Sequence, residues 1–414
     1  QNATWYGYDG SGRPTRSWSA RSQDGFNQSM APVLPQLLTM PTGALDVTVQ
    51  YDVADAPAVI TYPDAGLTTT HSYNGMGMLM KSVTESITSV APLLEQRLSY
   101  RLDGAITEQH VASAGAWKHD TYDYDHANRL VFWYLSTGNN IPLSYESYSY
   151  DAVGNRTQLR DPSTGLQLAG YTCAGGSNKL INVTYPAGGD LITYDPDGAM
   201  VYRKRDGVEG GLAFQRIEEY AWNAFNLLEQ FTVRTDAVAE GGGPGCEPDA
   251  TTMPADVWRY RFNPMQEREQ KRQEITSGNV ARDGLAWTYT LLGADTKQLA
   301  TYNGIEGAFC GQPSVWMWPV EYNSYGPANT RVILRPNGTK EYVIADHLGS
   351  PRITVNDQGA ILQHTTYAPF GSVLTTTGTG QRTGYIGLEA DNETGLGNYG
   401  VRLYEPEYGR FMSV

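Results

Sequence analysis

Short runs in which apolar and polar residues alternate recur along this chain. Clear examples are residues 106–113 (ITEQHVAS), 191–195 (LITYD), 200–205 (MVYRKR) and 342–346 (YVIAD). Alternation with a period of two places the apolar side chains on one face of an extended strand. The pattern therefore predicts many short β-strands, separated by turns rich in glycine, proline and asparagine.

One turn sequence returns after many of these runs. In YDAVG, residues 150–154, Asp stands at the first turn position and Gly at the fourth, which is typical of a type I turn. The carboxylate accepts a hydrogen bond from the backbone two residues on, and Gly takes the positive φ that forms a hairpin bulge. The same logic fits residues 223–226 and 356–359. The predicted repeat-turn residues are Tyr8, Asp9, Gly12, Tyr73, Asn74, Gly77, Tyr124, Asp125, Asn128, Tyr150, Asp151, Gly154, Arg156, Tyr194, Asp195 and Gly198.

A repeat of about twenty residues with one turn is one hairpin arm, which cannot bury a face alone, so neighbouring arms must stack into a continuous sheet. Two segments, 212–231 and 264–275, are rich in good helix formers. Each contains a repeat-like turn (WNAFNL and FNPMQE), and we therefore expect hairpin strands there. The predicted fold class is all-β, a long antiparallel β-hairpin ribbon.

The composition supports a folded β-protein with an acidic surface. The chain has 28 tyrosines against 9 phenylalanines, 45 glycines, 22 prolines and 18% charged residues. Its formal net charge of −14 argues against nucleic acid or anionic membrane as a partner. The longest apolar stretch, 30–40, is too short to span a membrane and contains two prolines. No basic region followed by an apolar run marks a targeting segment at the N-terminus.

The cysteines and histidines form no motif that predicts a metal or cofactor. The three cysteines are Cys173, Cys246 and Cys310, without a CxxC pair. A Cys246–Cys310 bridge and free thiols both remain open. The six histidines show no HExxH spacing, and the chain has no phosphate loop, dinucleotide fingerprint or calcium nonapeptide.

Two chemical alternatives stand beside a structural role. Asp346, His347 and Ser350 lie close in sequence, but adjacent strand residues point to opposite faces, so we expect no catalytic triad. Acidic residues are numerous enough to allow a pair of glycosidase carboxylates, although most of them occupy turn positions. The tyrosines are expected to pack across strands, and exposed stacking platforms for carbohydrate are the alternative.

The C-terminal third carries the most specific motifs. Residues 346–371 read DHLGSPRITVNDQGAILQHTTYAPFG, and residues 384–414 read GYIGLEADNETGLGNYGVRLYEPEYGRFMSV. Together with the Tyr-Asp turns, these resemble the RHS and YD-repeat proteins and their RHS repeat-associated core. Leu403 and Glu405 stand where that family more usually has Tyr and Asp. The motif residues are Asp346, His347, Leu348, Gly349, Ser350, Pro351, Arg352, Gly395, Leu396, Tyr399, Gly400, Arg402, Tyr404, Gly409, Arg410 and Phe411.

The resemblance implies a β-ribbon that spirals into a hollow shell. We expect this chain to form only part of such a shell. Such shells enclose a C-terminal toxin in bacterial polymorphic toxins and insecticidal toxin complexes, and related shells occur in teneurins. We therefore expect a secreted or cell-surface bacterial protein whose partner is a C-terminal effector domain or other chains of the same assembly.

The family's self-cleaving aspartates lie in a plug region that is expected beyond Val414. The resemblance therefore assigns a catalytic role to none of this chain's residues, and we expect no enzyme activity. The sequence begins within a repeat unit, which suggests a piece of a longer protein. We predict a YD-repeat array over 1–240, a Gly/Pro-rich loop or boundary at 241–256, and the RHS repeat-associated core over 257–414.

Overall fold

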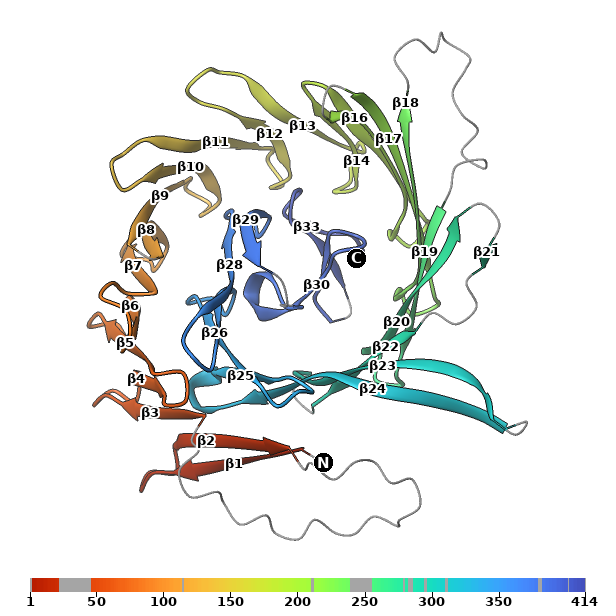
Figure 1. Cartoon of the computed structure of the whole chain (residues 1–414). Helices are drawn as coiled ribbons and strands as arrows, with labels where there is room; N and C mark the ends of the chain where they lie inside the picture. Colours follow the sequence, from red (N-terminus) through yellow and green to blue (C-terminus); the bar gives the residue numbers. More distant parts are fainter. Residues whose placement is uncertain are drawn as a thin grey trace. The chain divides into compact units, whose positions relative to one another are not determined.

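A computed structural model of the whole chain describes residues 2–21, 46–113, 115–209, 212–238, 255–277, 280–281, 286–293, 296–309, 312–378, 382–400 and 402–413. Within these ranges the chain contains β-strands, turns and two short 3-10 helices, and no α-helix. The strands pair antiparallel with their neighbours along the chain (Figure 1). The prediction of an all-β fold built from antiparallel hairpins is thereby confirmed.

The described chain divides into two compact units. Unit 1 is Gln1–His119, Val320–Tyr367 and Val373–Gln381, and unit 2 is Asp120–Pro319, Ala368–Ser372 and Arg382–Val414. Strands β9 (Ala116–Tyr124) and β24 (Gln312–Tyr325) each contain residues of both units. The predicted loop at 241–256 lies, apart from its last two residues, outside the described residues, so the predicted domain division stays a prediction.

Unit 1 contains two runs of hairpin strands. The first run is β1 (Asn2–Tyr8), β2 (Pro14–Arg21), β3 (Val47–Tyr51), β4 (Pro57–Tyr62), β5 (Leu67–Tyr73), β6 (Leu79–Ser86), β7 (Leu94–Tyr100) and β8 (Ile106–Ser113). The second is β25 (Arg331–Leu334), β26 (Lys340–Ala345), β27 (Pro351–Asn356), β28 (Ile361–Tyr367) and β29 (Val373–Gly378), with the 3-10 helix η1 (Pro327–Asn329) before it.

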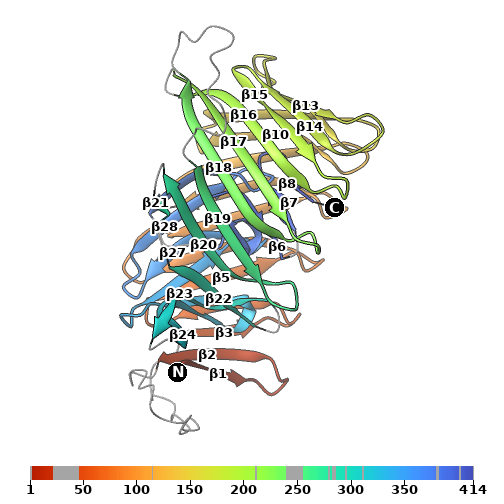
Figure 2. The same cartoon turned by 90° about the vertical axis from the view of Figure 1, so that its right-hand side faces the viewer.

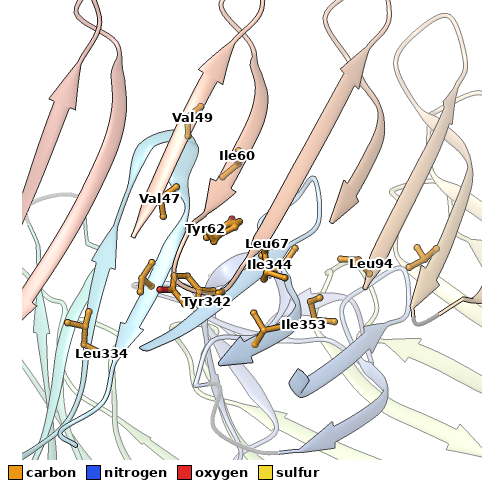
Figure 3. Packing of buried hydrophobic residues seen from close by; sticks show 14 residues of the cluster. Val47, Val49, Ile60, Tyr62, Leu67, Leu94, Leu334, Tyr342, Ile344 and Ile353 are labelled. Carbon is orange, nitrogen blue, oxygen red and sulfur yellow. The ribbon is translucent and has the colours of Figure 1, made fainter. Parts of the chain in front are cut away.

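The core of unit 1 lies between these two runs. Figure 3 shows side chains of β3, β4 and β5 facing those of β25, β26 and β27. Leu67 and Ile353 are buried at its centre. Tyr62 meets Tyr342 edge-on, with ring centroids 5.6 Å apart. The buried residues of β3 and β5 alternate with the period of two that the sequence displays, whereas every residue of β25 is buried.

Unit 2 contains the strands of the large sheet from β10 to β23. They are β10 (Leu130–Thr137), β11 (Pro142–Tyr150), β12 (Arg156–Arg160), β13 (Gln167–Cys173), β14 (Leu180–Tyr185), β15 (Gly188–Tyr194), β16 (Met200–Glu209), β17 (Leu212–Trp222), β18 (Leu228–Val238), β19 (Ala255–Phe262), β20 (Arg268–Ser277), β21 (Val280–Ala281), β22 (Trp287–Leu292) and β23 (Gln298–Phe309). Figure 2 shows β15 to β18 running side by side.

The two helix-like segments are strands. β17 pairs antiparallel with β18 around the turn at Asn223, and β19 pairs with β20 around the turn at Asn263. Each turn begins with an Asn whose side chain accepts backbone hydrogen bonds, so the turn residue fixes the hairpin. Tertiary packing here overrides the intrinsic helix propensity of the residues between the turns.

A second, small sheet completes unit 2. It contains β30 (Glu389–Asp391), β31 (Leu396–Asn398), β32 (Leu403–Glu405) and β33 (Arg410–Phe411), which follow the 3-10 helix η2 (Tyr385–Gly387). We call these four strands the C-terminal sheet. Its buried residues Leu396, Leu403 and Met412 join one hydrophobic cluster with Ile192 and Phe231 of the large strands. The C-terminal sheet is therefore packed on the strands of its own unit.

Candidate functional site

The Tyr-Asp turns have a common local structure. In the turn at residues 151–154, the Asp151 carboxylate accepts hydrogen bonds from the backbone N–H groups of Val153 (3.0 Å) and Asn155 (2.8 Å). Gly154 adopts φ 95° and donates to the Asp151 carbonyl. The side-chain hydrogen bond from Asn155 is the largest influence that lowers the pKa of Asp151. The Asp thus serves the turn itself.

The other predicted turn residues occupy equivalent places. Tyr8, Tyr73, Tyr124, Tyr150 and Tyr194 each end a strand. Asp9, Asn74, Asp125, Asp151 and Asp195 each begin a turn, and Gly12, Gly77, Asn128, Gly154 and Gly198 each have a positive φ. The register shifts by one residue at Tyr8, Tyr73, Tyr150 and Tyr194, which is the bulge that such a turn requires.

The repeated tyrosine has a task that the sequence did not reveal. The Tyr150 hydroxyl donates to the Leu130 carbonyl at 2.7 Å, and Leu130 follows the first residue of the preceding turn, Asp125, by five positions. Arg129 pairs with Asp125 and lies over the Tyr150 ring at 4.8 Å. One turn thereby holds the next through a hydrogen bond and a cation–π contact.

The same link recurs along the chain. In unit 1 the donors and acceptors are Tyr51 to the Pro14 carbonyl, Tyr73 to Pro57 and Tyr100 to Leu79, at 2.8, 2.8 and 2.6 Å. In unit 2 Trp222 replaces the tyrosine and donates its indole N–H to the Met200 carbonyl at 2.6 Å. In each case the acceptor stands five residues after the first turn residue. The Tyr that precedes most of these turns was the feature of the sequence that could have indicated this link.

The C-terminal sheet is held to the large strands of unit 2 by two groups of charged side chains, most of which are buried. The first, the Arg203 cluster, contains Asp190, Arg203, Arg205, Glu218, Glu405, Glu407 and Tyr408. Arg203 is 3% exposed and contacts Glu218 of β17 and Glu405 of β32, each at 2.5 Å. Arg205 donates two hydrogen bonds of 3.0 Å to Asp190. The arginines of β16 therefore bridge the large strands and the C-terminal sheet.

Burial and charge act in opposite directions on the two carboxylates that Arg203 joins. Burial raises the pKa of Glu405, and it outweighs the attraction of Arg203. For Glu218, burial also favours the neutral form, but the charges of Arg203 and Arg216 and the hydrogen bonds from Arg203 and Tyr220 together lower the pKa to about 2. Glu218 also accepts hydrogen bonds from Arg216 (2.5 Å) and Tyr220 (2.7 Å). These extra donors explain why Glu218 stays ionised more readily than Glu405.

The second group, the Arg268 cluster, contains Tyr260, Arg268, Lys271, Glu389, Asp391 and Glu393. Arg268 of β20 contacts Asp391 at 2.5 Å and Glu389 at 2.9 Å. Lys271 reaches Asp391 at 2.9 Å and Glu393 at 3.1 Å. Burial opposes ionisation here, yet the charges of Arg268 and Lys271 together lower the pKa of both Glu389 and Asp391. Burial raises the pKa of Glu393.

The last motif, Gly409-Arg410-Phe411, meets a Tyr-Asp turn. Arg410 donates to the Asn155 side chain and to the Asn178 carbonyl, both at 3.0 Å. Gly409 has φ 64°, and a Cβ there would lie 2.6 Å from the Arg156 guanidinium. Only glycine avoids both the strained backbone and this clash. The structure thus brings Arg156 of the repeat and Gly409 and Arg410 of the core motif together.

The remaining core-motif residues of the C-terminal sheet form an aromatic group. Tyr399 stacks on Tyr404 at 5.0 Å between ring centroids, and Phe411 meets both rings edge-on. Arg402 lies over the Phe411 ring at 3.8 Å. Gly395 and Gly400 supply positive φ in the turns, and Leu396 is buried. These residues shape the C-terminal sheet itself.

The Asp346 segment of unit 1 is another turn of the same type, and the reason given for excluding a triad is wrong. Asp346 and His347 are not adjacent strand residues. The Asp346 carboxylate accepts from the N–H groups of Leu348 (3.0 Å) and Ser350 (2.9 Å), and Gly349 has φ 87°. The predicted strand over 342–346 ends at Ala345, because Asp346 begins the turn.

The side chains around this turn lie in the interior of unit 1. The His347 Nδ1 lies 3.2 Å from the Gln96 amide nitrogen, and burial lowers the pKa of His347. Pro351 begins β27, and Arg352 is buried beside the Asp346 carboxylate at 3.7 Å. The side chains of Asp346, His347 and Arg352 are therefore those of a turn packed within unit 1.

Among the described residues, no group of three or more His, Cys, Asp or Glu side chains is arranged to hold a metal ion. Cys173 is a free thiol, whereas Cys246 and Cys310 lie outside the described residues, as does the bridge considered between them. No helix in the described ranges is long and apolar enough to cross a membrane.

Comparison with known proteins finds a family model that matches the C-terminal segment. Residues 321–414 match the family model described as the teneurin YD-shell. The Aedes aegypti protein named salivary gland surface protein 1 is 37% identical over 95 residues, which are 22% of this chain and 3% of that protein. The predicted resemblance to the RHS and YD-repeat family is confirmed by the match over residues 321–414.

Two solved structures align with most of the chain. A Photorhabdus luminescens Tc holotoxin pore aligns with 89% of this chain and 20% of its own, with 16% identity and a TM-score of 0.39. A TcdB2–TccC3–Cdc42 complex aligns with 99% of this chain and 28% of its own, with 13% identity and a TM-score of 0.31. The chain spans less than a third of the length of each of these proteins.

Proposed function

We propose that this chain is a wall section of an RHS-type protein shell that encloses or presents a C-terminal effector not contained in the chain. The supporting observation is the C-terminal sheet, which is held on the large strands of its unit by the Arg203 and Arg268 clusters. Because the large strands bind the C-terminal sheet, they can also retain a polypeptide that is joined to that sheet. The family match over residues 321–414 supports the same role.

The physical mechanism is enclosure. Interlinked turns and a continuous antiparallel sheet resist opening, because each Tyr-to-carbonyl link ties one hairpin to the one before it. An effector kept behind such a wall stays inactive until delivery. The partners under this proposal are the effector domain and other chains of the same assembly, and the setting is secreted or cell-surface in a bacterium.

The role is proposed as structural, without catalysis by this chain. The turn carboxylates already accept two backbone hydrogen bonds each, as Asp151 and Asp346 do, and this leaves them poorly placed to react. Prolonged incubation of the purified chain, followed by mass spectrometry, tests this. An intact mass supports the proposal, and a defined pair of fragments would contradict it.

An extracellular surface scaffold is the second candidate, with carbohydrate as its ligand. It is favoured by the name of the Aedes aegypti relative, which is a surface protein, and by exposed aromatic side chains such as Tyr8. Binding to a glycan array that disappears when exposed tyrosines are replaced would favour the scaffold over the container.

Negative-stain electron microscopy of the longer native protein tests the container directly. The proposal predicts a hollow particle with density inside. A solid globule would rule out enclosure, and an open ribbon or a polymer of this chain would favour the surface scaffold.

A further inference from the structure

The hairpin of β23 and β24 exposes a group of apolar side chains that no part of the proposed shell role uses. On β24 these are Val315, Trp316, Met317 and Trp318, which are 45%, 68%, 48% and 43% exposed. Ile305 of β23 is 39% exposed. Exposed tryptophans are uncommon on soluble proteins without a partner. We call the four residues of β24 the apolar arm.

The apolar arm shows apolar side chains on both faces of the strand. Successive residues of a strand point to opposite faces, so Trp316 and Trp318 lie on one face and Val315 and Met317 on the other. β25 pairs with β24 only over Tyr322–Tyr325, so it does not pair with the arm. A flat protein partner would cover one face, whereas a medium that surrounds the strand covers both.

The charge of the arm also restricts what can cover it. Residues 312–320 (QPSVWMWPV) contain no charged residue, in a chain with a net charge of −14. The arm offers no cation to attract an anionic surface, and the rest of the chain repels one. A neutral or zwitterionic surface is therefore the compatible one.

With about 150–250 Å² for a whole aromatic side chain, the exposed parts of the four residues amount to roughly 450 Å² of apolar surface. This equals about the apolar share of one side of a standard protein interface, so the choice of partner rests on the two-sided exposure of the strand and on its chemistry. Tryptophan has an apolar ring and a polar N–H, which suits the boundary between lipid headgroups and acyl chains. The unpaired edge of the strand remains hydrated at that depth.

From these observations we propose that the apolar arm inserts into the interface of a zwitterionic lipid bilayer and attaches the protein to a membrane surface. The insertion is shallow and does not span the bilayer. This attachment goes beyond the shell role and stands independently of it, because it depends on the β23–β24 hairpin alone.

The test is co-flotation of the full chain with vesicles of phosphatidylcholine in a density gradient. The wild-type chain is expected to float, and Trp316→Ser/Trp318→Ser is expected to bind about tenfold more weakly, with quenching by brominated phosphatidylcholine lost in parallel. Phe225→Ser/Met265→Ser is the matched control, because it removes two exposed apolar side chains from turns, 68% and 80% exposed, and should float as the wild type does. Adding phosphatidylserine should weaken flotation.

Several outcomes would overturn the proposal. Failure of the wild-type chain to float is one, and equal flotation of the tryptophan variant is another. Sedimentation that shows a dimer dependent on Trp316 and Trp318, without flotation, would assign the arm to a second copy of the chain instead. Circular dichroism melting of each variant guards against misfolding, which is not expected because both tryptophans are exposed.

Discussion

Replacing Arg203 with methionine tests whether the buried charges stabilise unit 2. The change leaves Glu218 and Glu405 without their shared cation at 2.5 Å, in a site where the arginine is 3% exposed. Removing one partner from a buried ion pair costs about 3–5 kcal/mol, because the remaining charge stays buried. With a urea m-value of about 2 kcal/mol/M, the midpoint of the unit 2 transition should fall by about 2 M.

The assay is urea unfolding followed by tryptophan fluorescence and far-ultraviolet circular dichroism. Because the described chain divides into two compact units, we expect two transitions, and the change should appear only in the one that includes unit 2. Arg234→Met is the control, since Arg234 pairs with Glu219 at the surface and an exposed pair contributes less than about 1 kcal/mol. Replacing all three charges, as Arg203→Met/Glu218→Gln/Glu405→Gln, should restore most of the lost stability.

The reasoning would be refuted if Arg203→Met and Arg234→Met shifted the midpoint equally. It would also fail if the triple variant were less stable than Arg203→Met, because the cost would then come from lost attraction and not from stranded carboxylates. A shift confined to the other transition would contradict the location of the cluster in unit 2.

Three further predictions follow from the turns and the Arg268 cluster. Gly409→Ala should cost about 1–3 kcal/mol more than Gly12→Ala in the urea assay, because both have positive φ but only at position 409 does a Cβ meet other atoms, 2.6 Å from the Arg156 guanidinium and 3.0 Å from the Phe370 ring; equal costs would contradict these contacts. Tyr150→Phe should cost about 0.5–1.5 kcal/mol through loss of the bond to the Leu130 carbonyl, whereas the control Tyr8→Phe, at an exposed tyrosine, should cost almost nothing. The pKa values of Glu389 and Asp391 are lowered, so their stabilising effect is present above the ordinary carboxyl values of 4.5 and 3.8 and is lost as pH falls below them. Urea midpoints should therefore fall as pH is lowered through this range, and less steeply in Arg268→Met. A flat profile in the wild type would contradict this prediction.

The turns were the part of the fold that the sequence predicted best. These turns are local: in most of them an aromatic residue precedes an Asp or Asn, and three residues later a Gly or Asn, or Gln266 in one case, has a positive φ. The chemistry of five residues therefore suffices. That local signal also identified segments 212–231 and 264–275 as strands against their helix propensity, because Asn223 and Asn263 cap turns there.

The charge clusters could not be predicted, because their members are distant in sequence. Arg203 and Glu405 are separated by 202 positions and Arg268 and Asp391 by 123, and nothing local marks either pair. The departure at Glu405 from the family's usual Asp was visible, but its meaning required the structure. The carboxylate at this position binds Arg203, and the longer side chain of Glu extends its reach by one methylene.

The central claim is that the C-terminal sheet is docked on the large strands of unit 2. Amide hydrogen exchange of the native chain, followed by mass spectrometry of peptides that cover residues 389–411, tests it most directly. The account predicts that amides of the C-terminal sheet exchange as slowly as those of β16 and β17, and much faster in Arg203→Met. Exchange of residues 389–411 at the rate of an open chain, while β16 and β17 stay protected, would contradict the docking.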